Sequence, residues 1–339
     1  MATTRPLVLT MGEPAGIGPE LALKTWHAHR QALPPFFVIA DPHHLESLAR
    51  LLAWPVPILA ISRPDEAAAA CSRGLPVLPE KLAEEARPGT LNPRNSGAVI
   101  AAIRRAVELV RDGQASAVVT NPIHKAALYE AGFNHPGHTE YLAELAGGDP
   151  TPVMMLVGGG LRVVPITIHV ALRDALAALD SGLIVEHGRI TAQALRDDFG
   201  IARPRLAVAG LNPHAGEAGA MGSEEIAIIE PAIRTLRAHG IDVEGPLPPD
   251  TMFHEGARRR YDAQLCMYHD QALIPIKTLA FDSGVNVTLG LPFVRTSPDH
   301  GTALDIAGTG TASETSLVAA LRLAAEISAT RSSASVAAL

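Results

Sequence analysis

Residues 7–28, LVLTMGEPAGIGPELALKTWHA, open with a short apolar run, pass through a glycine-rich turn and continue with a helical pattern. Further Val-, Ile- and Leu-rich runs alternate with amphipathic stretches, of which residues 96–111 have the clearest helical period. Residues 153–157 and 161–168 flank three glycines and predict an antiparallel hairpin. Because apolar strands that alternate with amphipathic helices suit a sheet covered by helices, the sequence predicts an α/β fold.

Composition limits the possible classes of protein. The 339 residues are 47% hydrophobic, 19% charged and 4% aromatic, which allows a large aliphatic core or two domains. The net charge of −7, without a basic patch, argues against nucleic acid as a partner. The two cysteines, Cys71 and Cys266, are far apart in sequence and favour a reducing cytoplasm over a disulfide framework. We expect no signal peptide at residues 1–6 and no membrane span, since every apolar window is broken well short of about 20 residues.

Three apolar runs are each followed by a histidine: His169, His214 and His269. In open α/β sheets, ligands gather beyond the carboxyl ends of the strands. Three imidazoles presented in this way would hold one divalent metal and leave coordination positions open for a substrate. The alternative is that each histidine only caps a strand end or packs in a loop. Asp270, beside His269, is a candidate to orient that ring or to accept a proton, and otherwise is a solvated acid.

Polar and cationic residues near these histidines suggest a site for an anion. Lys277, Asn286 and Arg295 follow His269, and Arg295 lies in an otherwise apolar stretch. Arginine offers a planar fork for phosphate or carboxylate, and lysine a point charge. His138 and Thr139 open a helical segment, whose N-terminal N–H groups attract anions. The alternatives are surface charges on loops and an ordinary helix cap.

Two glycine-rich stretches are candidates for a nucleotide site. Residues 300–310, HGTALDIAGTG, precede the last helical pattern, and a cofactor would lie across their backbone. The dinucleotide fingerprint G-x-G-x-x-G is not matched there. Residues 15–18 are suggestive, but they are equally well explained by a tight turn between strand and helix.

Several motifs together resemble those of the 4-hydroxythreonine-4-phosphate dehydrogenase family of vitamin B6 biosynthesis. They run in order over nearly the whole chain: GEPAGIGPE at 12–20, GHTE at 137–140, LNPHAGE at 211–217, MYHDQ at 267–271 and NVTLGLPFVRTS at 286–297. Residues 300–310 are also similar to the cofactor loop of isopropylmalate dehydrogenases. The resemblance implies two α/β/α domains with a cleft between them, as in the isocitrate and isopropylmalate dehydrogenases. We expect residues 1–135 and 300–339 to form one domain and residues 136–299 to form the central domain.

The resemblance also implies roles for individual residues. It places the metal ligands at His169, His214 and His269 and the substrate contacts at His138, Thr139, Lys277, Asn286 and Arg295. We consider Lys277 and Asp270 as catalytic proton acceptors, and His300, Gly301, Thr302 and Asp305 as cofactor-binding residues. The implied cofactors are NAD or NADP and one divalent metal per subunit, which is zinc, magnesium or cobalt. The implied assembly is a homodimer whose active sites are shared between subunits.

The activity that follows from the resemblance is the NAD(P)-dependent oxidation and decarboxylation of 4-phosphohydroxy-L-threonine to 3-amino-2-oxopropyl phosphate. The alternative within the family is a dehydrogenase of another hydroxy acid, such as erythronate or threonate 4-phosphate. A metal-dependent phosphate-ester hydrolase and a non-catalytic binding protein for phosphorylated metabolites are two further hypotheses. Neither gives the 300–310 loop a role.

Overall fold

The computed structural model describes residues 5–135 and 137–337 and divides the chain into two compact units. Unit 1 comprises residues 1–152 and 291–328, and unit 2 comprises residues 153–290 and 329–339. The boundaries expected from the sequence differ, because residues 136–152 and 291–299 belong to unit 1 and the final residues to unit 2. Residues 136–152 belong to unit 1 because helix α6 (His138–Ala146) packs against helix α4 (Ser96–Arg111). Residues 291–299 belong to it because strand β12 (Arg295–Pro298) pairs with strand β5 (Val118–Val119).

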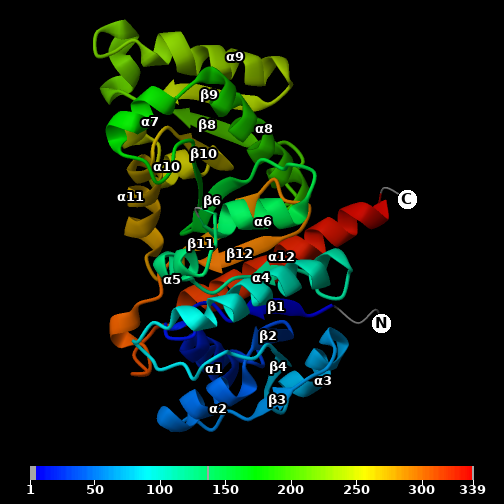
Figure 1. Ribbon diagram of the computed structural model, residues 1–339. Coiled ribbons are helices and arrows are strands. Elements are labelled where there is room, and N and C mark those ends of the chain that lie inside the picture. The colour runs from blue at the N-terminus through cyan, green and yellow to red at the C-terminus, as the bar shows by residue number, and fades with distance from the viewer. Residues whose placement is uncertain (1–4, 136, 338–339) are drawn as a thin grey trace. The chain divides into compact units, whose positions relative to one another are not determined.

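Among the described residues of unit 1, the strands have the order β3-β4-β2-β1-β5-β12 (Figure 1), and every neighbouring pair is parallel. Helix α4 packs against β1, β2 and β5. The remaining strands are β1 (Leu7–Thr10), β2 (Phe36–Ala40), β3 (Ile58–Ala60) and β4 (Leu75–Pro79). The remaining helices are α1 (Gly18–His29), α2 (Pro42–Leu51), α3 (Ala67–Cys71), α5 (Lys125–Glu130) and α12 (Thr315–Ala337), the last of which extends into unit 2.

Unit 2 contains a mixed set of strands in the order β11-β6-β7-β10-β8-β9. The expected antiparallel hairpin is β6–β7, and β6 also pairs antiparallel with β11. Strands β7, β10, β8 and β9 are parallel. The strands are β6 (Val153–Gly158), β7 (Leu161–Pro165), β8 (Arg205–Ala209), β9 (Asp242–Leu247), β10 (Ala263–Cys266) and β11 (Val285–Leu289). The helices are α7 (Leu172–Ala178), α8 (Ser181–Asp197), α9 (Glu230–Ala238), α10 (Glu255–Arg258) and α11 (His269–Ala280).

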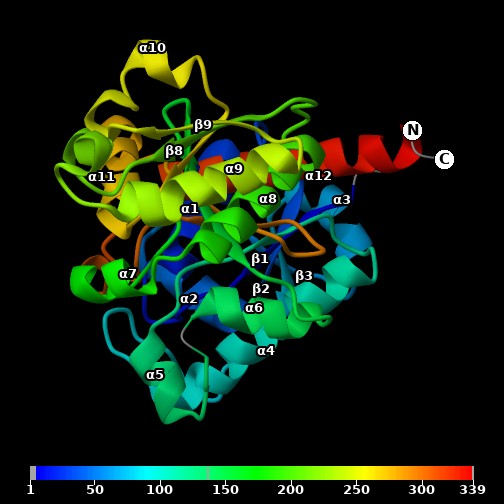
Figure 2. The same cartoon turned by 90° about the horizontal axis from the view of Figure 1, so that it is seen from above.

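Burial follows the apolar pattern of the sequence and confirms the α/β class. The strands β1, β2 and β10 are buried at every position, as parallel strands between helices should be. Helices α8 and α9 lie side by side in unit 2, as Figure 2 shows. Both cysteines are buried and free. Across the described residues, the helices include none with the length and apolar character that crossing a bilayer requires.

Candidate metal and substrate sites

The three candidate metal ligands follow three neighbouring strands of unit 2. Strand β10 lies between β7 and β8 and is parallel to both. His169 comes shortly after β7, His269 directly opens helix α11 after β10, and His214 lies in the loop after β8. Because the carboxyl ends of parallel neighbours lie at one edge of a sheet, all three imidazoles emerge from the same edge. Their order in space, 169–269–214, differs from their order in sequence.

The backbone at two of these histidines is unusual. His169 and His214 have φ angles of 53° and 51°, in the left-handed region that only a few per cent of residues other than glycine adopt. Such conformations cluster at functional sites because the surrounding fold must enforce them. The rings of His169 and His269 lie 5.9 Å apart between centroids. Within residues 5–135 and 137–337, however, no three His, Cys, Asp or Glu side chains are arranged closely enough to hold a metal. The structure thus pairs two of the predicted ligands and places the third on the adjacent strand end.

The other unit 2 candidates lie on α11 and β11. Asp270 Oδ1 is 2.7 Å from His269 Nδ1, and a hydrogen bond donated by Nδ1 leaves Nε2 available to a ligand. Lys277 lies later on the same helix, half-buried, with its Nζ 5.4 Å from the ring centroid of Phe281. Asn286 is half-buried on β11, opposite Leu156 of β6.

Unit 1 holds the candidate anion site around Arg295. This arginine is only 4% exposed at the start of β12, and its Nη2 donates to Thr120 Oγ1 at 2.7 Å. Burial lowers its pKa to about 10, an effect opposed by the charge of Glu140, so the guanidinium stays cationic at neutral pH. Helix α6 begins at His138, as expected, and His138 and Thr139 are half-buried in its first turn. Arg295 and the N-terminus of α6 therefore provide positive charge in the same unit.

Lys125 belongs to this group, although it was not among the residues predicted from the sequence. Its Nζ lies 3.6 Å from the position that a β-carbon would take at Gly137, directly before α6. A larger residue at position 137 would thus meet the lysine. The signal in the sequence was the segment directly after the apolar strand, in which Asn121 and His124 precede Lys125.

His138 has an unusual protonation equilibrium. Burial, and then the positive charges of Arg295 and Lys125, hold its pKa well below the ordinary value, so the ring is neutral at neutral pH. Its Nε2 is buried and accepts or donates no hydrogen bond within the described part of the chain. A dianion bound beside the ring would favour the imidazolium, because it offsets the repulsion from the two cations.

We therefore expect the pKa of His138 to rise when inorganic phosphate saturates the site. NMR titration of histidine-labelled protein with and without phosphate measures this shift. The exposed His239 serves as the control, since phosphate should leave its ring signals unchanged. An unchanged His138 titration curve at saturating phosphate would show that no anion binds next to the ring.

The candidate cofactor loop is tied to the first turn and helix of unit 1. Ile17 N donates to Thr302 O at 3.0 Å, and a β-carbon at Gly16 would come within 2.8 Å of the same oxygen. Residues 11–18 are buried throughout. The glycine-rich turn is therefore the tight turn between strand and helix that the sequence left as one of two explanations, and its backbone supports the 300–310 loop.

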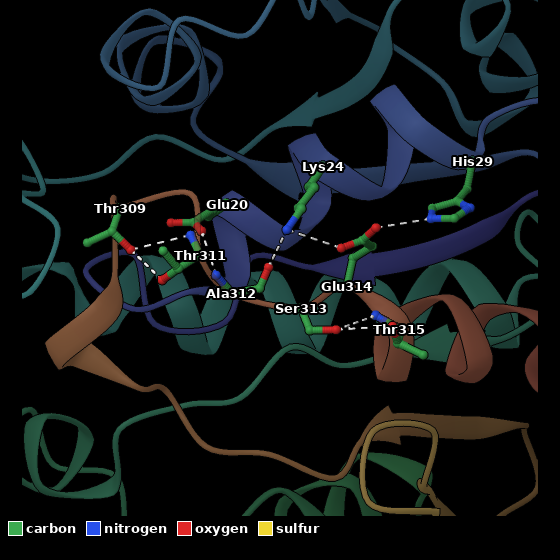
Figure 3. Close-up of polar contacts among 9 residues, drawn as sticks. All are labelled: Glu20, Lys24, His29, Thr309, Thr311, Ala312, Ser313, Glu314 and Thr315. Carbon is green, nitrogen blue, oxygen red and sulfur yellow. Dashed lines mark hydrogen bonds and ion pairs between the residues drawn. The ribbon is translucent and has the colours of Figure 1, made fainter.

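Helix α1 fixes the far end of this loop through a fully buried carboxylate (Figure 3). Glu20 Oε2 accepts from Gly308 N at 2.8 Å and Oε1 from Ala312 N at 3.3 Å. Further along α1, Lys24 donates to Ala312 O and pairs with Glu314. The predicted cofactor residues lie before these anchors. Gly301 and Asp305 are exposed, Thr302 is half-buried, and His300 Nδ1 lies 3.0 Å from Gly301 O.

Known proteins are similar to this chain in sequence and in fold. A 4-hydroxythreonine-4-phosphate dehydrogenase of Bradyrhizobium diazoefficiens is 56% identical over 339 residues, covering 96% of this chain and 98% of the relative. The corresponding protein of Caulobacter vibrioides is 53% identical and covers 97% and 99%. A crystal structure of the Klebsiella pneumoniae 4-hydroxythreonine-4-phosphate dehydrogenase superposes with a TM-score of 0.87 at 40% identity, covering 96% of this chain and 100% of that one. The model of the family "Pyridoxal phosphate biosynthetic protein PdxA" matches residues 32–324. The chain belongs to the PdxA family.

Proposed function

We propose that this protein is a dehydrogenase that oxidises 4-phosphohydroxy-L-threonine with NAD or NADP and a divalent metal. In this reaction the C3 hydroxyl would be oxidised to a ketone with release of a proton, and NAD or NADP would supply the hydride acceptor. The resulting β-keto acid loses CO2 and leaves 3-amino-2-oxopropyl phosphate, a precursor for pyridoxine 5′-phosphate. The names of the relatives that cover nearly the whole chain support this substrate. Among the structural observations, the three histidines at one sheet edge give the proposed function its strongest support.

Unit 2 supplies donor types that a divalent metal accepts, and the described part of one chain brings two of the three histidines, His169 and His269, together. His169, His214 and His269 would supply three neutral nitrogen ligands, a set that accepts zinc, cobalt or other divalent ions. When bound, the metal would lower the pKa of the substrate hydroxyl and stabilise the developing negative charge on its oxygen. Asp270 would hold the His269 ring in the tautomer that presents Nε2.

The residues of unit 1 suit the phosphate and the cofactor. Arg295, His138 and Thr139 would bind the anionic head of the substrate. Lys277 and Asn286, described separately in unit 2, are the other proposed substrate contacts. Fixing the substrate in this way can supply up to about 7–11 kcal/mol towards the barrier. His300, Gly301, Thr302 and Asp305 would contact the nicotinamide cofactor. Because Asp270 is hydrogen-bonded to His269, we propose Lys277 as the group that receives the proton of the substrate hydroxyl.

We further propose that the protein is a cytoplasmic homodimer whose active sites are shared between subunits. Unit 2 exposes large apolar side chains close in sequence to the metal candidates. These are Val170 at 51%, Leu172 at 58%, Ile274 at 63% and Phe281 at 73% exposure. An apolar surface of this kind is typical of a protein interface.

A coupled assay tests the proposed function. With 4-phosphohydroxy-L-threonine, we expect reduced cofactor and CO2 to appear in equal amounts. A chelator should abolish both products, and added zinc, magnesium or cobalt should restore them. Erythronate and threonate 4-phosphates, assayed in parallel, identify a different hydroxy-acid substrate. Release of free phosphate without reduced cofactor would instead show a hydrolase, and full activity after complete metal removal would exclude the metal-dependent mechanism.

The Glu20 contacts give a specific prediction for cofactor binding. In Glu20→Gln the amide NH2 would face a backbone N–H that now donates to a carboxylate oxygen. An unsatisfied buried polar group costs about 1–3 kcal/mol, so we expect the affinity for NAD or NADP to fall by about tenfold or more. The dissociation constant of the reduced cofactor, measured by its fluorescence, reports this change.

Glu314→Gln is the matched control, because Glu314 pairs with the side chains of Lys24 and His29 and not with the loop backbone. It should have a smaller effect on cofactor affinity. Equal affinities in the wild type and Glu20→Gln would show that this carboxylate does not position the cofactor loop.

A further inference from the structure

Glu13 is a buried acid in the glycine-rich turn between strand β1 and helix α1, and it is 5% exposed. Its Oε1 accepts from Ala15 N at 3.1 Å. Within residues 5–135 and 137–337, Oε2 accepts no hydrogen bond. An unpaired oxygen of a buried carboxylate costs free energy, so a ligand that donates an N–H or O–H to Oε2 would remove that cost.

Neighbouring segments of unit 1 hold this turn in place. Glu13 N donates to Pro122 O at 2.8 Å, in the loop after β5, and Ile17 N donates to Thr302 O at 3.0 Å, in the loop after β12. Strands β1, β5 and β12 are adjacent and parallel, so their carboxyl ends lie at one edge of the sheet. In open α/β sheets, ligands bind at that edge. Glu13 is therefore a fixed acceptor at the edge where a ligand of unit 1 is expected.

Cationic groups near this edge restrict the kind of donor that Glu13 would bind. Burial raises the pKa of Glu13, and the bond from a backbone N–H and the positive charge of His124 oppose that shift. Lys125 follows His124 directly, and Arg295 Nη2 donates to Thr120 Oγ1, directly after β5. These cations would repel the ammonium group of a substrate but not a neutral amide. The preferred donor is thus an uncharged N–H group.

A nicotinamide dinucleotide has two neutral NH2 groups, one on the carboxamide of the nicotinamide and one on the adenine. The proposed cofactor loop meets the turn of Glu13 through Thr302 O. Hydride transfer requires the nicotinamide to lie next to the substrate. Arg295, a proposed substrate contact, is bonded to the end of β5, the strand that pairs with β1. The nicotinamide is therefore the end of the cofactor that belongs beside Glu13.

We propose that Glu13 binds the carboxamide NH2 of the nicotinamide through Oε2 and thereby orients the ring at the end of β1. This inference rests on the proposed function, since it takes NAD or NADP as the cofactor and the 300–310 loop as part of its site. A carboxylate is a stronger acceptor for this NH2 than a neutral group. Because the backbone of the turn is already held on both sides, little ordering is needed when the cofactor binds.

An analogue of the cofactor tests this contact. In 3-acetylpyridine adenine dinucleotide a methyl group replaces the carboxamide NH2, while the adenine is unchanged. Calorimetric titration of the full-length protein gives the dissociation constants of NAD and of this analogue, or of the corresponding 2′-phosphorylated pair if the protein prefers NADP. We expect the wild type to bind the natural cofactor about tenfold more tightly or better, because the analogue loses a hydrogen bond to a charged group.

Glu13→Gln is expected to abolish this preference. Glutamine keeps an acceptor for Ala15 N, but an NH2 group replaces the second carboxylate oxygen. The natural cofactor should bind more weakly, the analogue should change little, and the two dissociation constants should become nearly equal. Glu20→Gln is the matched control, because Glu20 is a fully buried acid that bonds to the backbone of the cofactor loop. It should weaken both dinucleotides by the same factor and so preserve their ratio.

The outcomes separate this contact from the proposed function. If Glu13→Gln does not fold, the shorter Glu13→Asp replaces it, with the same expected loss of preference. Equal affinities of the wild type for the cofactor and its analogue, or an unchanged ratio in a folded Glu13 variant, would overturn this inference and leave the dehydrogenase proposal intact. A wild-type protein that binds neither NAD nor NADP would overturn the proposed cofactor and this inference with it.

Discussion

Replacement of His214 by asparagine is expected to reduce kcat/KM for 4-phosphohydroxy-L-threonine by about a thousandfold, because a metal supplies several kcal/mol of transition-state stabilisation. Asparagine is preferable to alanine here. The φ angle of His214 is 51°, and asparagine tolerates the left-handed region better than most residues. Loss of activity can then be assigned to the missing imidazole and not to a rearranged loop.

Metal content and stability complete the His214→Asn experiment. Bound metal per subunit, measured by elemental analysis, should fall together with activity, and the melting temperature of the metal-free protein should change little. His239→Asn is the matched control, since His239 is an exposed histidine after α9 in the same unit. A His214→Asn protein that keeps full activity and full metal content would remove His214 from the ligand set.

Replacement of Arg295 by methionine is expected to lower kcat/KM for the phosphorylated substrate by about 100-fold or more, because truncating a buried, hydrogen-bonded charge at a binding site costs about 2–5 kcal/mol. Methionine preserves much of the volume of the 4%-exposed side chain, so packing around β12 is maintained. The loss should appear mainly in KM if Arg295 binds substrate and transition state equally. Steady-state kinetics measure both parameters.

A second substrate identifies the group that Arg295 contacts. If the guanidinium binds the phosphate, Arg295→Met should have a much smaller effect on 4-hydroxythreonine, which lacks it. Arg104→Met, at an exposed position on α4 in the same unit, should leave both substrates unaffected. An equal loss with both substrates would contradict phosphate binding and assign the arginine to the carboxylate or to the structure of β12.

The local pattern of the sequence was sufficient for much of the fold. The helix at 96–111 has the predicted bounds, and the hairpin around residues 158–160 is antiparallel as predicted. These elements are set by apolar periodicity and by glycine-rich turns, which act over a few residues. The same local reasoning placed a histidine after each of three strands and noticed an arginine in an apolar stretch.

Only the tertiary structure decided which strands and side chains are neighbours in space. The chain order of the histidine-bearing strands is β7, β8, β10, but β10 lies between the other two, so His269 is the central ligand candidate. Lys125 Nζ lies 3.6 Å from the position of a β-carbon at Gly137, and Gln271 donates to Gly210 O after β8, across 61 residues of sequence. Likewise, β12 joins unit 1 because it pairs with β5. Such neighbours depend on the packing of whole strands and helices, and no pattern of a few residues specifies that packing.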